Sequence, residues 1–103
     1  MVKVFVYGTL RKGCTNHRLL EDIDFVDAEC KGIERFWKVG YSFPFARHNK
    51  ESKIYGELYS VDKETLARLD LLEGHPSFYK RELLRVSDSK GKEYQAWIYL
   101  VQK

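Results

Sequence analysis

Residues 2–8, near the start of the sequence, read Val2-Lys3-Val4-Phe5-Val6-Tyr7-Gly8. β-Branched and aromatic side chains dominate this run, and such residues favour a β-strand. Apolar residues fill nearly every position, which indicates a strand that is buried on both faces and lies inside a sheet. Gly8 and Gly13 then bracket a loop. Such a loop can point backbone N–H groups at an anion, although an ordinary strand-to-helix turn explains the same pattern.

The rest of the chain predicts further strands and two helices. Alternating or β-branched runs predict strands over residues 25–28, 33–39, 54–61, 79–86 and 94–101. Thr15 caps a short helix, and Gly56 marks a bulge or a close approach of two backbones. The turn at residues 88–91 makes the last two strands a hairpin, which argues against a purely parallel sheet. We therefore expect a single α+β domain over residues 1–103, with a mostly closed sheet.

The longer helix is predicted over residues 63–73. Asp62 is a good N-cap, whereas Gly74 and Pro76 favour an end to the helix just after residue 73. The predicted apolar face consists of leucines that recur every three residues, widened by two neighbours: Leu66, Leu69, Leu72, Ala67 and Leu71.

Glu73 occupies the C-terminus of this predicted helix. That end of a helix carries partial negative charge, which disfavours an ionised carboxylate. The leucines beside Glu73 indicate partial burial, which disfavours the charged form as well. Both effects raise a carboxyl pKa toward neutrality, as a general acid/base requires. A solvent-exposed glutamate tolerated at a helix end is the competing interpretation.

Composition narrows the classes of function. The net charge is +3, and basic residues alternate with acidic ones, which argues against a nucleic-acid-binding stripe. Aromatic residues make up 15% of the chain and are spread over all the predicted strands, so core packing explains them better than base stacking. The sequence contains no apolar run of the ~18 residues that a membrane span needs. We expect a cytoplasmic protein with reduced thiols and no nucleic-acid or membrane partner.

Metal and nucleophile chemistry find little support in the sequence. The histidines at positions 17, 48 and 75 have no zinc-like spacing to each other or to Cys14 and Cys30. A Cys–His dyad would lack a third group to orient it. We expect His75 to pack in the turn after the helix, and His17 to cap the first loop or line the rim of a pocket. No metal or other cofactor is predicted.

Two motifs resemble signatures of a known family. Residues 7–11, Tyr-Gly-Thr-Leu-Arg, with Gly13 and Asn16, are similar to the Tyr-Gly-[Ser/Thr]-Leu signature of the gamma-glutamylcyclotransferase-like family. The second motif comprises Leu69-Asp70, Leu72-Glu73-Gly74, Pro76, Tyr79 and Arg81. The Phe43-Pro44 pair and residues 55–59 resemble further landmarks, so the likeness covers the whole chain in order. It is strongest to the short branch that includes gamma-glutamylamine cyclotransferase.

The resemblance implies a small mixed α/β domain with a barrel-like, largely antiparallel sheet and a pocket beside it. It implies cofactor-free release of 5-oxoproline and a free amine from a small gamma-glutamyl substrate. Glu73 maps to the catalytic acid/base, and the substrate-binding residues are expected to be Tyr7, Gly8, Thr9, Leu10, Tyr79 and Arg81. Tyr79 is expected to act through its hydroxyl, and Arg81 by pairing with a carboxylate, of the substrate or of the protein. A non-catalytic module that binds a gamma-glutamyl or related amino acid is the alternative.

Overall fold

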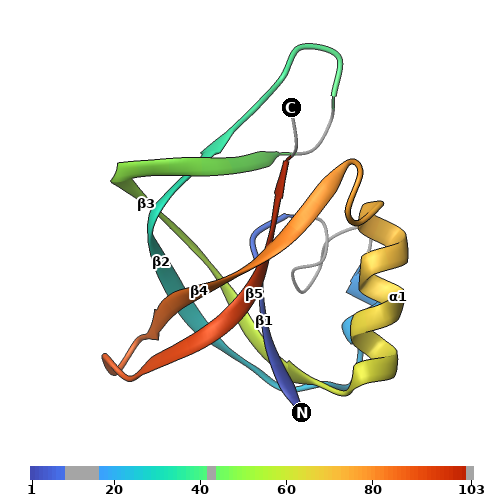
Figure 1. Cartoon of the computed structure of the whole chain (residues 1–103). Helices are drawn as coiled ribbons and strands as arrows, with labels where there is room; N and C mark the ends of the chain where they lie inside the picture. Colours follow the sequence, from blue (N-terminus) through green and yellow to red (C-terminus); the bar gives the residue numbers. More distant parts are fainter. Residues whose placement is uncertain (9–16, 42–43, 102–103) are drawn as a thin grey trace.

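The protein forms a closed barrel of five strands with one α-helix on its outside (Figure 1). The structure is a computed structural model that describes residues 1–8, 17–41 and 44–101. The elements are β1 (Val2–Val6), the 3₁₀ helix η1 (His17–Leu20), β2 (Phe25–Phe36), β3 (Phe45–Val61), α1 (Lys63–Glu73), β4 (Tyr79–Asp88) and β5 (Glu93–Val101). Around the barrel the strand order is β1-β3-β2-β4-β5, and β5 returns to β1. The predicted α+β class with a barrel-like sheet is confirmed.

The first strand lies inside the sheet, as predicted. β1 pairs antiparallel with β3 and parallel with β5, where Val4 lies opposite Trp97. Alternate side chains of a strand point to opposite faces. Phe5 accordingly packs in one buried cluster with residues of β2 to β5, whereas Val4 and Val6 pack in a second cluster that includes the buried leucines of α1. Both faces of β1 are therefore covered.

β2 joins two segments that the sequence predicts as separate strands. Its register with β3 shifts between Lys31 and Ile33, where Gly32 adopts a φ of 85°. Side chains disfavour this left-handed region, so the glycine permits a bulge after which the strand continues. β2 ends at Phe36, and Val39 is fully exposed, so the prediction of a strand over residues 37–39 is wrong.

β3 begins at Phe45, whereas the sequence predicts a start at residue 54. The additional half of the strand is largely polar, and its residues 45–48 pair with β2 in the register that follows the shift. Glu34 and Arg47 form an ion pair across these two strands. In Figure 1 these halves of β2 and β3 form a ribbon at the upper end of the sheet, below the segment that follows β2. Cross-strand pairs stabilise such a ribbon, and hydrophobic periodicity does not detect them.

Gly56 marks a close approach of two strands, as predicted. A Cβ on Gly56 would lie 2.3 Å from the carbonyl oxygen of Val6 and 2.8 Å from Cζ of Phe5. No side chain fits in that space, so glycine lets β3 pack directly on β1. This contact fixes the position of the strand that leads into Tyr7.

α1 begins and ends at the predicted residues. The side chain of Asp62 accepts a hydrogen bond from the backbone N–H of Thr65 at 2.7 Å, which caps the first turn. Gly74 follows the last residue with a φ of 68°, and its N–H bonds back to carbonyls of the last turn. A capping side chain and a glycine after the last residue act locally, so both ends of α1 could be predicted from the sequence without knowledge of the tertiary structure.

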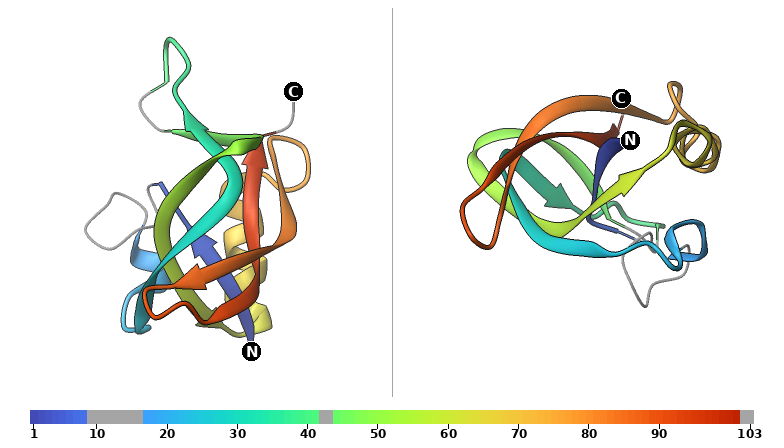
Figure 2. Two further views of the ribbon diagram at one scale, coloured as in Figure 1. Left: turned by 90° about the vertical axis from the view of Figure 1, so that its left-hand side faces the viewer. Right: turned by 90° about the horizontal axis from the view of Figure 1, so that it is seen from below.

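The apolar face of α1 is narrower than predicted. Leu66 and Leu69 are buried, but Leu71 is 84% and Leu72 43% exposed, and Ala67 is exposed too. The prediction that these last three residues join the buried face is wrong. Figure 2 shows the reason, because α1 lies outside the barrel and contacts it along one side only.

Candidate active site

Glu73 is the last residue of α1 and is partly buried. Burial raises the pKa of its carboxyl group to about 7, since the charged form loses hydration. A carboxyl group with this pKa is present in both protonation states near neutral pH. It can therefore take up a proton and return it, as a general acid/base must.

The groups that surround Glu73 come from the barrel. The leucines on which the sequence argument relied, Leu71 and Leu72, are largely exposed, so the predicted burial is right for a different reason. Burial is the main cause of the raised pKa values of three tyrosines, and the charge of Glu73 adds to each: Tyr7, Tyr79 and Tyr99. The carboxyl group thus lies within electrostatic reach of three phenols. We name Glu73 and these tyrosines the Glu73 cluster.

Backbone carbonyls hold two of the three phenols in place. The Tyr7 hydroxyl donates to the carbonyl oxygen of Tyr99 at 2.5 Å, and the Tyr79 hydroxyl donates to that of Pro44 at 3.2 Å. Pro44 also lies against Gly8, where an added Cβ would be 3.5 Å from the proline Cγ. The structure therefore connects Gly8 and Tyr79 through Pro44, while the charge of Glu73 acts on the Tyr7 phenol.

Arg81 pairs with a carboxylate of the protein. Its Nε donates to Oδ1 of Asp70 at 2.8 Å, and its Nη2 donates to Oδ2 at 3.1 Å. The guanidinium carbon lies 4.3 Å from the ring centre of Trp97. The expected pairing of Arg81 with a carboxylate is thus confirmed for a protein partner, and its binding to substrate stays a prediction.

Several predicted positions lie outside the described residues, namely Thr9, Leu10, Arg11, Gly13, Cys14, the predicted helix cap Thr15, Asn16, Phe43 and the side chain of His17. His75 packs in the turn after α1, as predicted, and its Nδ1 accepts a hydrogen bond from the backbone N–H of Arg81 at 3.3 Å. Within the described ranges, no three His, Cys, Asp or Glu residues lie together in a way that could hold a metal ion. None of the described helices is long and apolar enough to cross a membrane.

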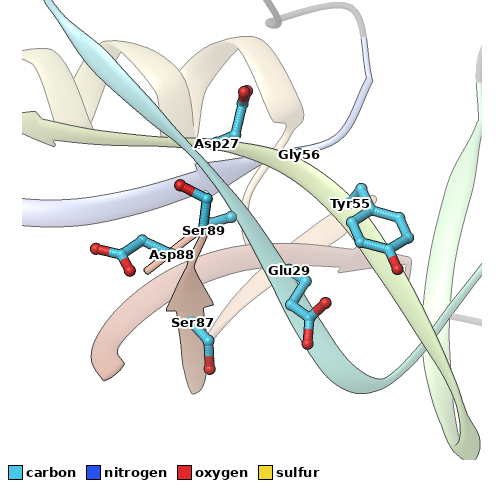
Figure 3. A pocket seen from close by; sticks show the side chains of 8 residues that line it. Asp27, Glu29, Tyr55, Gly56, Ser87, Asp88 and Ser89 are labelled. Atoms are coloured by element: carbon cyan, nitrogen blue, oxygen red, sulfur yellow. The ribbon is translucent and has the colours of Figure 1, made fainter. Parts of the chain in front are cut away.

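A hollow lies where β2 meets β4, away from the Glu73 cluster. It has a volume of about 310 Å³ and is lined by residues of both strands, of β3 and of the turn after β4: Asp27, Ala28, Glu29, Tyr55, Gly56, Ser87, Asp88 and Ser89. Figure 3 shows that the carboxylates of Asp27, Glu29 and Asp88 point in different directions and do not converge. Glu29 is paired with Lys53 at 3.6 Å. This groove therefore lacks the focused chemistry of the Glu73 cluster.

Sequence reasoning from the residues did not select Tyr99, and it gave Asp70 no role of its own. Tyr99 lies 92 positions from its partner Tyr7, and only the closed barrel brings them together. Asp70 carried a weak signal, because it lies three residues before Glu73 and therefore on the same side of a helix.

The family model described as "Gamma-glutamyl cyclotransferase, AIG2-like" matches residues 4–103. The chain belongs to this family. A family relative from Methanocaldococcus jannaschii is 42% identical over 101 residues, which cover 96% of this chain and 83% of the relative. Gamma-glutamylaminecyclotransferase of Rattus norvegicus is 33% identical over 115 residues, which cover 96% of this chain and 77% of the rat protein.

Solved structures agree with this membership of the gamma-glutamyl cyclotransferase family. The crystal structure of an AIG2-like protein from Mus musculus superposes with a TM-score of 0.86 at 28% identity, covering 98% of this chain and 77% of that one. A structure named gamma-glutamyl cyclotransferase has a TM-score of 0.80 at 17% identity, with 99% and 67% coverage, and shows the shared fold. The predicted family and its fold are confirmed.

Proposed function

We propose that this protein releases 5-oxoproline and a free amine from a small gamma-glutamyl amide, with Glu73 as the acid/base. The observation that carries the proposal is the buried carboxyl group at the end of α1, whose pKa of about 7 suits two-way proton transfer. Membership of the gamma-glutamyl cyclotransferase family supports this reaction class. The name of the rat relative supports gamma-glutamyl amines as the substrates.

The reaction moves protons from the α-nitrogen of the substrate to the nitrogen that leaves. The α-amine of the gamma-glutamyl group attacks its own γ-amide carbonyl, which forms a C–N bond and closes a five-membered lactam. The C–N bond to the leaving amine then breaks. Two protons leave the α-nitrogen as the ammonium becomes the lactam N–H: Glu73 takes one and returns it to the departing nitrogen, and the other passes to solvent, from which the released amine takes one to become an ammonium. Glu73 therefore ends in its starting state. Because attack is intramolecular, holding the folded-back conformer supplies much of the acceleration.

The Tyr7–Leu10 segment is proposed to hold the gamma-glutamyl group. Gly8 has no Cβ, so the substrate can approach its backbone closely. Backbone N–H groups of residues 8–10 would bind the α-carboxylate or the developing oxyanion. The Tyr79 hydroxyl is proposed to orient the substrate, and its charge coupling to Glu73 supports a place beside the acid/base.

A mass-spectrometric screen for 5-oxoproline tests the proposal. Purified protein is incubated with gamma-glutamyl-ε-lysine, other gamma-glutamyl amines and gamma-glutamyl dipeptides. We expect release from at least one amine, and a loss of about 100- to 10,000-fold in the Glu73→Gln variant. Glu64→Gln is the matched control, because Glu64 lies in the first turn of the same helix with a side chain that is 74% exposed.

The outcomes separate clearly. Release by the wild type and the Glu64→Gln control, but not by Glu73→Gln, supports both the reaction and the role of Glu73. Unimpaired release by Glu73→Gln would remove Glu73 from the mechanism. If the folded wild type releases no 5-oxoproline from any compound of the panel, the proposed reaction class is contradicted.

A further inference from the structure

Asp70 and Glu73 lie one helical turn apart on α1, in opposite electrostatic environments. Burial acts to raise the pKa of Asp70, but hydrogen bonds from Arg81 and Tyr99 outweigh it and lower the pKa below its usual range. Burial alone raises the pKa of Glu73. Asp70 is thus an ionised, paired carboxylate, and residues at this spacing share a helix face.

Three hydrogen bonds from the barrel end on the Asp70 carboxylate. Two come from the fork of Arg81, and the third comes from the Tyr99 hydroxyl, 2.6 Å from Oδ1. The side chains of Asp70 and Arg81 are only 20% and 21% exposed. A bidentate Arg–carboxylate pair fixes orientation as well as distance. The last turn of α1 is therefore held in one orientation against β4 and β5.

The partners of Asp70 are themselves fixed. The guanidinium group of Arg81 lies over the Trp97 ring, and this contact restricts its rotation. The turn after Glu73 is tied to the same strand, because the backbone N–H of Arg81 bonds to His75. The backbone N–H of His75 in turn donates to the carbonyl oxygen of Asp70 at 2.9 Å. The helix end, the turn and β4 thus form one connected unit.

Tyr99 joins this unit to the Glu73 cluster. Its hydroxyl donates to Asp70, while its backbone carbonyl accepts the hydroxyl of Tyr7. One residue of β5 therefore fixes both the helix that carries Glu73 and Tyr7, the tyrosine that follows β1.

We propose that Asp70, Arg81 and Tyr99 are positioning residues, a clamp that fixes the last turn of α1 on β4 and β5 and holds the Glu73 carboxyl group beside Tyr7 and Tyr79. This inference rests on the proposed function of Glu73. In this proposal the Arg81 guanidinium group binds the Asp70 carboxylate of the protein and not the substrate. Several titratable or charged groups influence Glu73 or its neighbours from the surrounding elements: Tyr7 on the β1 side, Arg35 on β2, Tyr79 and Arg81 on β4, Tyr99 on β5, and Asp70 and His75 on the helix and its turn.

Two charge-conserving variants test the clamp. Arg81→Lys keeps the positive charge but loses the fork, and Tyr99→Phe removes one hydroxyl. Both should admit water to Glu73, so its pKa should fall by about one unit toward the ordinary value. The pKa is measured directly by ¹³C NMR titration of the glutamate side-chain carboxyl groups, with Glu73→Gln to assign the signal. This readout does not depend on the substrate or on turnover.

Turnover gives the second readout. In each variant kcat should fall on the order of 10-fold, with the acid limb of its pH profile moved to lower pH, because Glu73 is less well placed. KM should change less than about 3-fold. The controls are Arg85→Lys and Tyr94→Phe, which make the same changes near the far ends of β4 and β5, where Arg85 pairs with Glu93 and Tyr94 bonds to Asp88. They should leave both readouts unchanged.

Each other outcome overturns the clamp. A KM raised more than about 10-fold in Arg81→Lys, with kcat and the pKa of Glu73 unchanged, would make Arg81 a substrate-binding residue. A lowered Tm with both readouts unchanged would leave the three residues a structural role only. If the wild type releases no 5-oxoproline, the proposed function fails, while the NMR titration still decides whether the clamp sets the state of Glu73.

Discussion

Carboxyl groups lie both at the end of α1 and in the groove between β2 and β4, but the pKa is raised at the first place and lowered at the second. In the groove, Asp88 accepts the backbone N–H groups of Lys90 and Lys92 at 2.9 Å each and the Tyr94 hydroxyl at 3.0 Å. Burial acts to raise the pKa of Asp88, yet these bonds lower it below its usual range. At the end of α1, burial raises the pKa of Glu73 to about 7.

The shape of the surface therefore does not identify the proposed acid/base, because the hollow and Glu73 lie in different places. The groove is a hollow in the surface, but its Asp88 carboxyl group has a lowered pKa and is stabilised in the ionised form. Proton transfer needs a group whose two protonation states are close in free energy at the working pH. Within the described part of the chain, a raised carboxyl pKa is found at Glu73.

The largest expected effect is on turnover, with matched variants that shorten one glutamate in each region. Glu73→Asp withdraws the carboxyl group by one methylene and should reduce kcat on the order of 1,000-fold, because both proton transfer and its geometry suffer. Glu29→Asp makes the same change in the groove and should alter kcat less than about 2-fold. Steady-state kinetics on the preferred substrate measure both. Equal losses would abolish the distinction between the two regions.

The second effect is on stability as a function of pH. The folded-state pKa of Glu73, about 7, lies above its ordinary value of 4.5, so its stabilising contribution is complete below pH 4.5 and is lost as the pH rises through 7. Glu73→Gln should therefore match the wild type near pH 4.5 and exceed it at pH 8 by about 3 kcal/mol of unfolding free energy. Urea denaturation at both pH values measures this. A gain that is the same at both pH values would show that burial does not act on the charged form.

The smallest effect concerns the groove and has the opposite sign. The pKa of Asp88 is lowered in the folded protein, so its contribution is present at neutral pH and is lost as the pH falls through that lowered value. Asp88→Ala should lower the Tm at pH 7, and the difference should close on acidification, as followed by circular dichroism. The turnover of the folded variant should remain at the wild-type level. A lowered turnover would give the groove a part in the reaction.

Features set by local signals were predictable from the sequence. The N-cap Asp62 and the left-handed Gly74 defined both ends of α1. The nearly continuous apolar run placed β1 inside the sheet, and Gly56 was identified as a point of close approach or a bulge. The candidate acid/base was singled out because a glutamate at a helix C-terminus breaks a local preference.

Features set by the tertiary fold were not predictable in this way. The first half of β3 is held by its pairing with β2. Because it is largely polar, it shows no alternation of apolar and polar residues that would predict a strand. Leu71 and Leu72 follow the helical period but extend beyond the contact with the barrel. Tyr99 has no local mark at all, because its importance arises from Asp70 on one side and Tyr7 on the other.

The parallel contact between β1 and β5 closes the barrel, and it also determines when the site can exist. Tyr7 and its partner Tyr99 are 92 positions apart, so their bond forms only after the chain has been synthesised as far as β5. Contacts of such long range are slow to form, because a large loop must close first. An intermediate with α1 and the β2–β3 hairpin already formed would still lack the Glu73 cluster. Activity would therefore appear in the last step of folding, and its recovery during refolding would report barrel closure itself.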